Sequence, residues 1–260
     1  MERLQLKTPF SFRRNIPFYY QKTEQEFKQD KYENYDEMVM RQTRLHLSEQ
    51  AWSRYAFQPV LDWIFQEIDQ GNPKTIADIG CSVGRLIGEL AIRFPTANCW
   101  GLDYSYQLLR QANDYWINGE NFDLQNTNRG FKTEKLTGKQ LKNLHFGLAK
   151  GECLPFEKEA LNLVVSSFTL DRFDEPIIAL EEMFRILENN GSALIVSPLN
   201  FQKRTHWAQC FPMVKLLSEI RKIGFKIERV TKNLIIKEPL DARKNSIHWD
   251  CLALNLTKKG

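Results

Sequence analysis

A short stretch of glycines and acids, set between two apolar runs, is the part of the sequence best suited to chemistry. Asp78 lies in the apolar run 75–79, Gly80 and Gly84 follow it, and helical spacing of apolar residues begins after Gly84. This pattern predicts a buried strand, a tight turn and a helix. Glycines in such a turn let a ligand approach the backbone, and the N–H groups that begin the helix face that ligand.

The glycine spacing separates this turn from two other nucleotide-binding turns. A dinucleotide fold requires G-x-G-x-x-G, and a P-loop requires lysine and then serine or threonine after its last glycine. The stretch Gly80-Cys-Ser-Val-Gly84 fits neither pattern. A second apolar run, 99–102, ends at Asp103, and an acid in that place usually binds ribose hydroxyls. We therefore expect a ligand that contains a nucleoside.

Asp78-Ile-Gly-Cys-Ser-Val-Gly84 and Gly101-Leu-Asp-Tyr-Ser105 together resemble the cofactor site of class I S-adenosylmethionine-dependent methyltransferases. Gly151-Glu-Cys-Leu-Pro-Phe156 resembles a segment of the small-molecule group that includes the quinone-biosynthesis enzymes. The resemblance implies an α/β fold, a Rossmann-like doubly wound sheet of about seven strands with an antiparallel last strand. It also implies S-adenosyl-L-methionine as the cofactor. The motifs cover residues 74–200, and the remainder resembles the family only in its layout.

The resemblance assigns cofactor-binding roles to residues that follow the predicted strands. Asp78 would reach the amino end of the cofactor, and Asp103 would accept both ribose hydroxyls. Tyr104 and Leu154 would sandwich the adenine, with simple packing as the alternative for both. The full expected set is Asp78, Gly80, Cys81, Gly84, Asp103, Tyr104, Gly151, Glu152, Leu154 and Ser167.

Two positions depart from the family pattern. Lys150 replaces the aspartate that typically hydrogen-bonds the adenine amine, and lysine offers no acceptor there. Asn162 stands where the family usually has aspartate. These departures leave open a non-catalytic, methyltransferase-like partner subunit as an alternative of another class.

Methyl transfer from a sulfonium mainly requires alignment and a dry site, and it needs a base only when the acceptor must lose a proton. Asp171 and His206 are the candidates for such a base. The alternatives for Asp171 are a surface loop acid or a partner for Arg172, and the alternative for His206 is a surface histidine. Asp171, Asp174 and Asn200 would be the only metal candidates, and we expect no metal.

The domain organisation follows from what surrounds these motifs. We expect an N-terminal helical or irregular cap over 1–72, with helices opening at the capping box Thr23–Glu26 and over 53–69, and the methyltransferase core over 73–260. The polar stretch 118–142 is expected to be an insertion, either a lid or plain disorder. Further strands are expected over 144–149, 161–167, 192–197, 225–236 and 247–256, and a loop over 198–213.

The composition indicates which classes of binding partner and which cellular location to expect. The net charge is +4 with scattered basic residues, which does not favour a nucleic-acid partner, and five cysteines without a C-x-x-C indicate reduced thiols. No signal peptide or membrane span is expected. We therefore expect a cytoplasmic enzyme that methylates a small-molecule N, O, S or C acceptor. A methyltransferase for protein or tRNA is the nearest alternative, and the sequence indicates neither the acceptor nor the oligomeric state.

Overall fold

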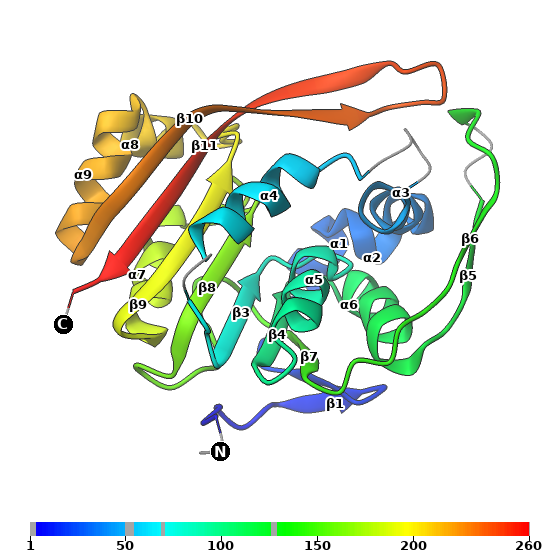
Figure 1. Cartoon of the computed structure of the whole chain (residues 1–260), viewed down its shortest axis with the longest axis horizontal. Coiled ribbons are helices and arrows are strands. Elements are labelled where there is room, and N and C mark those ends of the chain that lie inside the picture. The colour runs from blue at the N-terminus through cyan, green and yellow to red at the C-terminus, as the bar shows by residue number, and fades with distance from the viewer. Residues whose placement is uncertain (1–3, 50–54, 69–70, 126–128, 260) are drawn as a thin grey trace.

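The computed structural model describes residues 4–49, 55–68, 71–125 and 129–259. Within these residues a nine-stranded sheet runs through the centre of the molecule, with helices on both of its faces (Figure 1). The strand order is β1-β2-β7-β4-β3-β8-β9-β11-β10. None of the described helices has the length and apolar character needed to cross a membrane.

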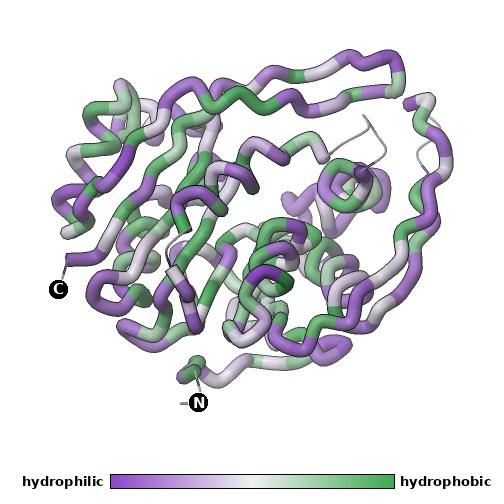
Figure 2. Tube along the Cα trace, viewed as in Figure 1, coloured by the Kyte–Doolittle hydropathy of each residue, from purple (hydrophilic) through white to green (hydrophobic). Residues whose placement is uncertain are grey.

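Seven of these strands form the predicted Rossmann-like sheet. The five that pair in parallel are β3 (Thr75–Ile79), β4 (Asn98–Asp103), β7 (Leu144–Leu148), β8 (Leu161–Ser167) and β9 (Leu187–Ser197). The last strand, β11 (Ser246–Lys258), pairs antiparallel with β9 and with β10 (Phe225–Pro239), which confirms the expected ending. Figure 2 shows the hydrophobic residues concentrated on the central strands, as strands buried on both faces require.

Alternate residues of the central strands pack on different helices. Ile76 and Val165 belong to one apolar cluster, and Ala77 and Val164 belong to the other. The first cluster is completed by α4 (Gln58–Glu67), α5 (Arg85–Arg93) and α6 (Tyr106–Asn113), which continues into a π-turn over Asp114–Asn118. The second is completed by α7 (Pro176–Ile186), α8 (Arg204–Cys210) and α9 (Met213–Ile223).

Two helices differ from the expectation. The helix expected over 53–69 begins at Gln58 in the structure, and residues 53, 54 and 69 lie outside the described residues. The loop expected over 198–213 contains α8, so that part of the prediction was wrong. Cys210, the last residue of this helix, is fully buried, and that burial has no local sequence signal.

The N-terminal segment adds two strands that the sequence did not predict. β1 (Ser11–Arg13) and β2 (Ile16–Phe18) form a hairpin, and Phe18 pairs with Leu148 of β7. Arg14 and Asn15 form the turn with φ values of 48° and 63°, the left-handed geometry that two-residue hairpins favour. Since this hairpin shares the sheet with the core, the division at residue 72 stays a prediction.

Three helices follow the hairpin and contribute to the cavity described below. They are α1 (Glu24–Gln29), α2 (Lys31–Asn34) and α3 (Asp36–Leu47). The predicted capping box is present, because the Thr23 hydroxyl accepts from Glu26 N and the Glu26 carboxylate accepts from Thr23 N.

The insertion over 118–142 forms a separate two-stranded sheet of β5 (Phe122–Leu124) and β6 (Glu134–Leu136). Arg44 of α3 donates to the carbonyl oxygen of Leu124 at 2.7 Å and pairs with Glu134 at 3.7 Å. Arg44 and Glu134 are both buried, so this ion pair attaches the insertion to α3. Residues 126–128 lie outside the described residues, and a lid role stays a prediction.

The β10–β11 hairpin extends past the rest of the sheet. β11 pairs with β9 only from Leu252 onward, whereas β10 and β11 continue to pair as far as Pro239 and Ser246 (Figure 1). The projecting half therefore has one face free to cover the ends of the neighbouring strands.

Candidate functional site

The carboxyl ends of β3, β4, β7 and β8 open into one cavity of about 750 Å³. This is where open α/β sheets bind ligands. The rest of its wall comes from α1 to α3, the residues around the start of α4, and the projecting half of the β10–β11 hairpin. The expected cofactor residues that line it are Asp78, Gly80, Cys81, Asp103, Tyr104, Gly151, Glu152, Leu154 and Ser167.

Gly84, the remaining member of that set, supports the turn without lining the cavity. Gly80 and Gly84 have φ values of 81° and 78°, which favour glycine. A Cβ atom at Gly84 would lie 2.8 Å from the Phe146 ring, and one at Gly80 would lie 2.0 Å from Thr169 Cγ2. Both positions therefore require glycine, but only Gly80 faces the cavity.

Asp103 connects the end of β4 to the glycine turn. Its carboxylate accepts hydrogen bonds from Ser82 N and Ser105 N, both at 2.8 Å. Burial raises the pKa of Asp103 to about 6, and the two backbone hydrogen bonds oppose that rise. The carboxylate is thus fixed in position at the edge of the cavity.

Asp78 lies at the end of the neighbouring strand and is only 2% exposed. Burial raises its pKa to about 8, and the nearby charge of Asp103 adds to the effect. The cavity therefore holds two acids that resist ionising together. A positively charged ligand would stabilise the ionised form of both.

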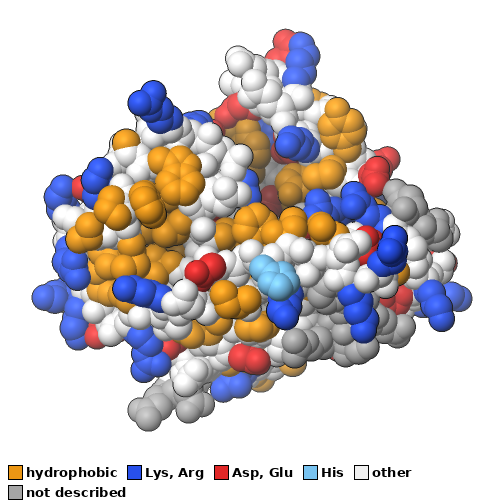
Figure 3. Space-filling model, turned by 90° about the horizontal axis from the view of Figure 1, so that it is seen from above, with side chains coloured by type: hydrophobic (Ala, Val, Ile, Leu, Met, Phe, Trp, Pro, Cys, Tyr) orange, Lys and Arg blue, Asp and Glu red, His pale blue; other side chains and the backbone are white. Residues whose placement is uncertain are grey.

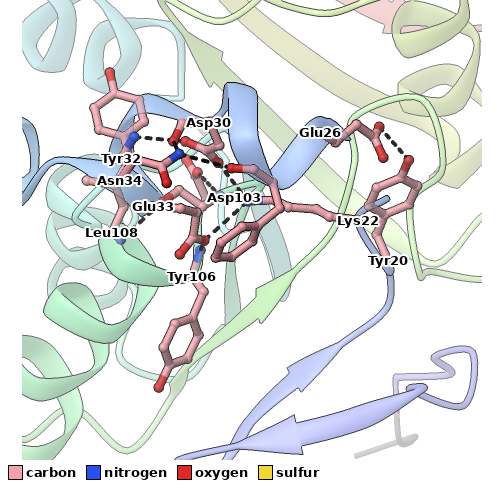
Figure 4. Close-up of polar contacts among 12 residues, drawn as sticks. Tyr20, Lys22, Glu26, Asp30, Tyr32, Glu33, Asn34, Asp103, Tyr106 and Leu108 are labelled. Atoms are coloured by element: carbon pink, nitrogen blue, oxygen red, sulfur yellow. Dashed lines mark hydrogen bonds and ion pairs between the residues drawn. The ribbon is translucent and has the colours of Figure 1, made fainter. Parts of the chain in front are cut away.

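The N-terminal helices contact the β4–α6 connection through a set of charged residues. Lys22 pairs with Asp30 at 2.6 Å and with Glu33 at 3.2 Å, and Glu33 accepts from Tyr106 N at 2.8 Å (Figure 4). The Lys22 ammonium also lies 4.3 Å from the centre of the Tyr104 ring. These contacts hold α1 and α2 beside the end of β4.

Lys150, which replaces the aspartate of the family pattern, forms ion pairs with two carboxylates. Its ammonium lies 2.9 Å from Asp174 Oδ2 and 3.3 Å from Glu26 Oε1. Hydrogen bonding and the charge of Asp174 raise the pKa of Lys150 against the opposing effect of burial. Glu26, Lys150 and Asp174 all line the cavity, so acceptor oxygens are available there although lysine has none.

Asn162 has a structural role at the opposite end of the sheet. Its Oδ1 accepts from Lys74 N at 2.7 Å and from Thr75 N at 3.0 Å, where β3 begins. Asn162 does not line the cavity. This departure from the family pattern therefore leaves the binding site unchanged.

The two candidate bases are buried outside the cavity lining. Asp171 is 1% exposed, accepts from Ser197 Oγ at 2.9 Å, and has Arg172 Nε 3.5 Å from its Oδ2. His206 is 2% exposed and meets Phe201 edge-on. The structure gives neither side chain a position from which to contact a ligand in the cavity. Asp171 therefore matches the alternative of a partner for Arg172, whereas the alternative of an exposed side chain fits neither residue.

His46 is a cavity residue that the sequence did not single out. Its Nδ1 lies 3.1 Å from the Tyr55 hydroxyl, and burial together with the charge of Arg85 lowers the pKa of His46 to about 4. The imidazole is therefore neutral near pH 7. The spacing along the helix could have identified His46 as a cavity residue, because residues three and four apart lie on one face of a helix. The residues of α3 that line the cavity follow this spacing: Met38, Arg41, Gln42, Leu45 and His46.

Metal-binding geometry was sought over the described part of the chain. There, no group of three or more His, Cys, Asp or Glu side chains is arranged to hold a metal ion. Asp174, one of the metal candidates, is instead paired with Lys150 and Lys203.

Comparison with known proteins adds family evidence to this geometry. Residues 77–195 match the family described as methyltransferase domain. No curated protein sequence matches the chain.

Three solved structures illustrate the shared fold. One is a complex between the Haloferax volcanii Trm112 methyltransferase activator and a methyltransferase, with a TM-score of 0.58, 14% identity, and coverage of 89% of this chain and 98% of that chain. A SAM-dependent methyltransferase from Methanosarcina mazei has a TM-score of 0.51, 16% identity, and coverage of 75% and 97%. The [4+2]-cyclase SpnF has a TM-score of 0.53, 14% identity, and coverage of 77% and 80%. At these identities the similarity shows the fold alone.

Proposed function

We propose that this protein, whose residues 77–195 form an S-adenosylmethionine-dependent methyltransferase domain, transfers the methyl group of that cofactor to a small molecule in the same cavity. One observation carries the proposal. The cavity of about 750 Å³ is lined both by the acidic strand ends and by aromatic rings, among them Phe57 and Phe168. Its volume falls within the range of roughly 300–1,000 Å³ that is usual for small-molecule sites.

The acidic side suits the cofactor. S-adenosylmethionine carries an ammonium and a sulfonium, and these positive charges would favour ionisation of Asp78 and Asp103. In this assignment Asp103 accepts from the ribose hydroxyls and Asp78 binds the ammonium directly or through water. Gly80 supplies the left-handed backbone of the turn at the cavity, and Tyr104 and Leu154 lie on either side of the adenine.

The adenine amine requires an acceptor that Lys150 does not supply. Glu26 and Asp174, held by the Lys150 ammonium, are the nearest acids to that position in the lining. We assign the acceptor role to this pair, with Glu26 contributed by α1. The N-terminal segment then takes part in cofactor binding as well as covering the site.

The chain contributes alignment and exclusion of water to the transfer step. The bound sulfonium supplies an already activated methyl group. Correct alignment of an acceptor against it is worth on the order of 7–11 kcal/mol. Neutral His46 offers a hydrogen-bonding nitrogen to the acceptor, and its low pKa makes it a weak base. The site therefore suits acceptors that need little help in losing a proton.

A protein or tRNA acceptor remains the alternative and would be favoured by a continuous positive surface. On the face shown in Figure 3, basic side chains occur at both ends with acidic side chains among them. The insertion over 118–142, expected to contribute to such a surface, is attached to α3 by the Arg44–Glu134 pair. These features support a small acceptor bound inside the cavity.

Calorimetric titration tests the proposal. S-adenosylmethionine and S-adenosylhomocysteine should both bind, and Asp103→Ala should weaken each by about 10- to 100-fold, because a hydrogen bond to a charged group contributes about 1.5–3 kcal/mol. Asp123→Ala, at an exposed site in β5, should leave the affinity unchanged. Circular dichroism would confirm that both variants fold. Absence of binding by either ligand to the wild-type protein would contradict the proposal.

The affinity for S-adenosylhomocysteine should rise with pH between about 5 and 8. The pKa of Asp103 is raised to about 6 and that of Asp78 to about 8, so both acids are largely protonated at the low end of this range, and at the high end Asp103 is ionised and Asp78 is about half ionised. Only the ionised forms attract the ligand ammonium. Asp78→Asn should flatten the upper part of the profile. An affinity that falls with rising pH would refute these roles.

Glu26→Gln should weaken S-adenosylhomocysteine binding by about 3- to 10-fold, since it removes a charged acceptor worth about 1 kcal/mol. Glu24→Gln provides the matched control, because Glu24 lies in the same helix and its carboxylate pairs with Lys28 at the surface. Titration of both variants measures the difference. Equal affinities would show that α1 does not contribute to the adenine site.

A further inference from the structure

Aromatic rings from separate parts of the chain form one wall of the cavity. The ring centres of His46 and Phe57 are 5.0 Å apart, those of Phe57 and Phe168 are 4.9 Å apart, and those of Phe168 and Trp249 are 6.2 Å apart. All four residues line the cavity. They belong to α3, the residue before α4, the loop after β8, and β11. We call these four residues the aromatic wall.

Phe168 is held in this wall by an unusual backbone. Its φ is 60°, a left-handed value that a bulky residue seldom adopts. Its N–H donates to the carbonyl oxygen of Val196 at 2.8 Å, which fixes the loop after β8 against β9. Such strain persists only where the surrounding structure enforces it, and it is most frequent at functional sites. Here it places the ring between Phe57 and Trp249.

One of the positively charged residues that line the cavity is available to a ligand. Both oxygens of Glu238 are engaged, one by Arg41 and the other by Trp249 Nε1 at 2.8 Å. Arg172 also lines the cavity, and its Nε lies 3.5 Å from Oδ2 of buried Asp171. Among the described residues, no partner contacts the two terminal nitrogens of Arg172. The ion pair with Asp171 therefore involves only the Nε side of the guanidinium and leaves its two terminal nitrogens available to a ligand.

We propose that the methyl acceptor is a flat aromatic molecule that carries an acidic group, with its ring on the aromatic wall and its oxyanion on the terminal nitrogens of Arg172. The inference rests on the proposed function and names the substrate class of that site. Aromatic rings pair well in tilted and edge-to-face arrangements, and a guanidinium binds a carboxylate through two parallel hydrogen bonds. A saturated acid would lack the ring contacts with the aromatic wall, and a neutral aromatic molecule would lack the ion pair with Arg172.

One competing assignment uses the same residue. Arg172 could instead bind the carboxylate of the cofactor itself. Substitution of Arg172 would then weaken cofactor binding, whereas the acceptor assignment leaves cofactor affinity intact. The experiment must therefore measure both ligands.

The test titrates three probes into the full-length protein saturated with S-adenosylhomocysteine. They are 2-naphthoate, the neutral 2-naphthamide of the same shape, and the saturated cyclohexanecarboxylate. We expect 2-naphthoate to bind at least about tenfold more tightly than either of the others, a difference of about 1.4 kcal/mol. Equal or undetectable binding of all three, with S-adenosylhomocysteine bound, would overturn the inference and leave the proposed function standing.

Two variants then assign the contacts. Arg172→Gln should reduce 2-naphthoate affinity to the level of 2-naphthamide, and Phe57→Leu should reduce the affinity of both aromatic probes. Arg204→Gln and Phe12→Leu, at exposed positions, should change neither. All four variants should bind S-adenosylhomocysteine with wild-type affinity, which also shows that they are folded. A loss of S-adenosylhomocysteine affinity in Arg172→Gln alone would assign Arg172 to the cofactor and overturn the acceptor contact.

Discussion

The rest of this structure depends on two carboxylates at the ends of neighbouring strands. Asp78 is the penultimate residue of β3, Asp103 is the last residue of the adjacent strand β4, and both line the same cavity. Burial and mutual repulsion raise their pKa values to about 8 and about 6. Because both pKa values are raised in the folded state, the folded protein favours the protonated acids. The free energy of unfolding that these acids contribute is therefore present at low pH and is lost as pH rises from about 4 through about 6 and about 8. A cationic ligand that binds the folded state offsets this loss.

The elements around these acids serve to keep them in place and to enclose what they bind. The glycine turn supplies N–H groups to Asp103, and the N-terminal helices place Lys22 and Glu33 against the following turn. Lys150 draws Glu26 toward the same cavity from a segment more than a hundred residues away. The cap, the core and the projecting hairpin thus form a single enclosure.

The sequence predicted the parts of this site that depend on local pattern. An apolar run that contains Asp78 and another that ends at Asp103 identified two parallel strands, because such strands are buried on both faces and their carboxyl ends meet at one edge. The β1–β2 hairpin was missed because its strands are three residues long and Pro17 lies within one of them. Asn15 was the sequence signal that could have indicated it, because asparagine tolerates the left-handed backbone of a two-residue hairpin turn.

The rest of the site depends on contacts between distant segments. The aromatic wall joins residues 46, 57, 168 and 249, and no spacing rule brings such positions together. Burial of Asp171 and His206 likewise follows from tertiary packing, because both belong to polar segments that suggested exposure. Asn162 and Lys150 differ from the family pattern in the same way, yet one holds the start of a strand and the other lines the cavity.

A crystal structure of the protein with S-adenosylhomocysteine bound is the most direct test of the central claim. That claim is that the acids of one cavity hold the cofactor while its reactive sulfur faces the aromatic wall. The account predicts ribose hydroxyls within hydrogen-bonding distance of Asp103 and the sulfur directed toward Phe168. Density for the ligand outside this cavity, or a sulfur directed away from Phe168, would contradict it.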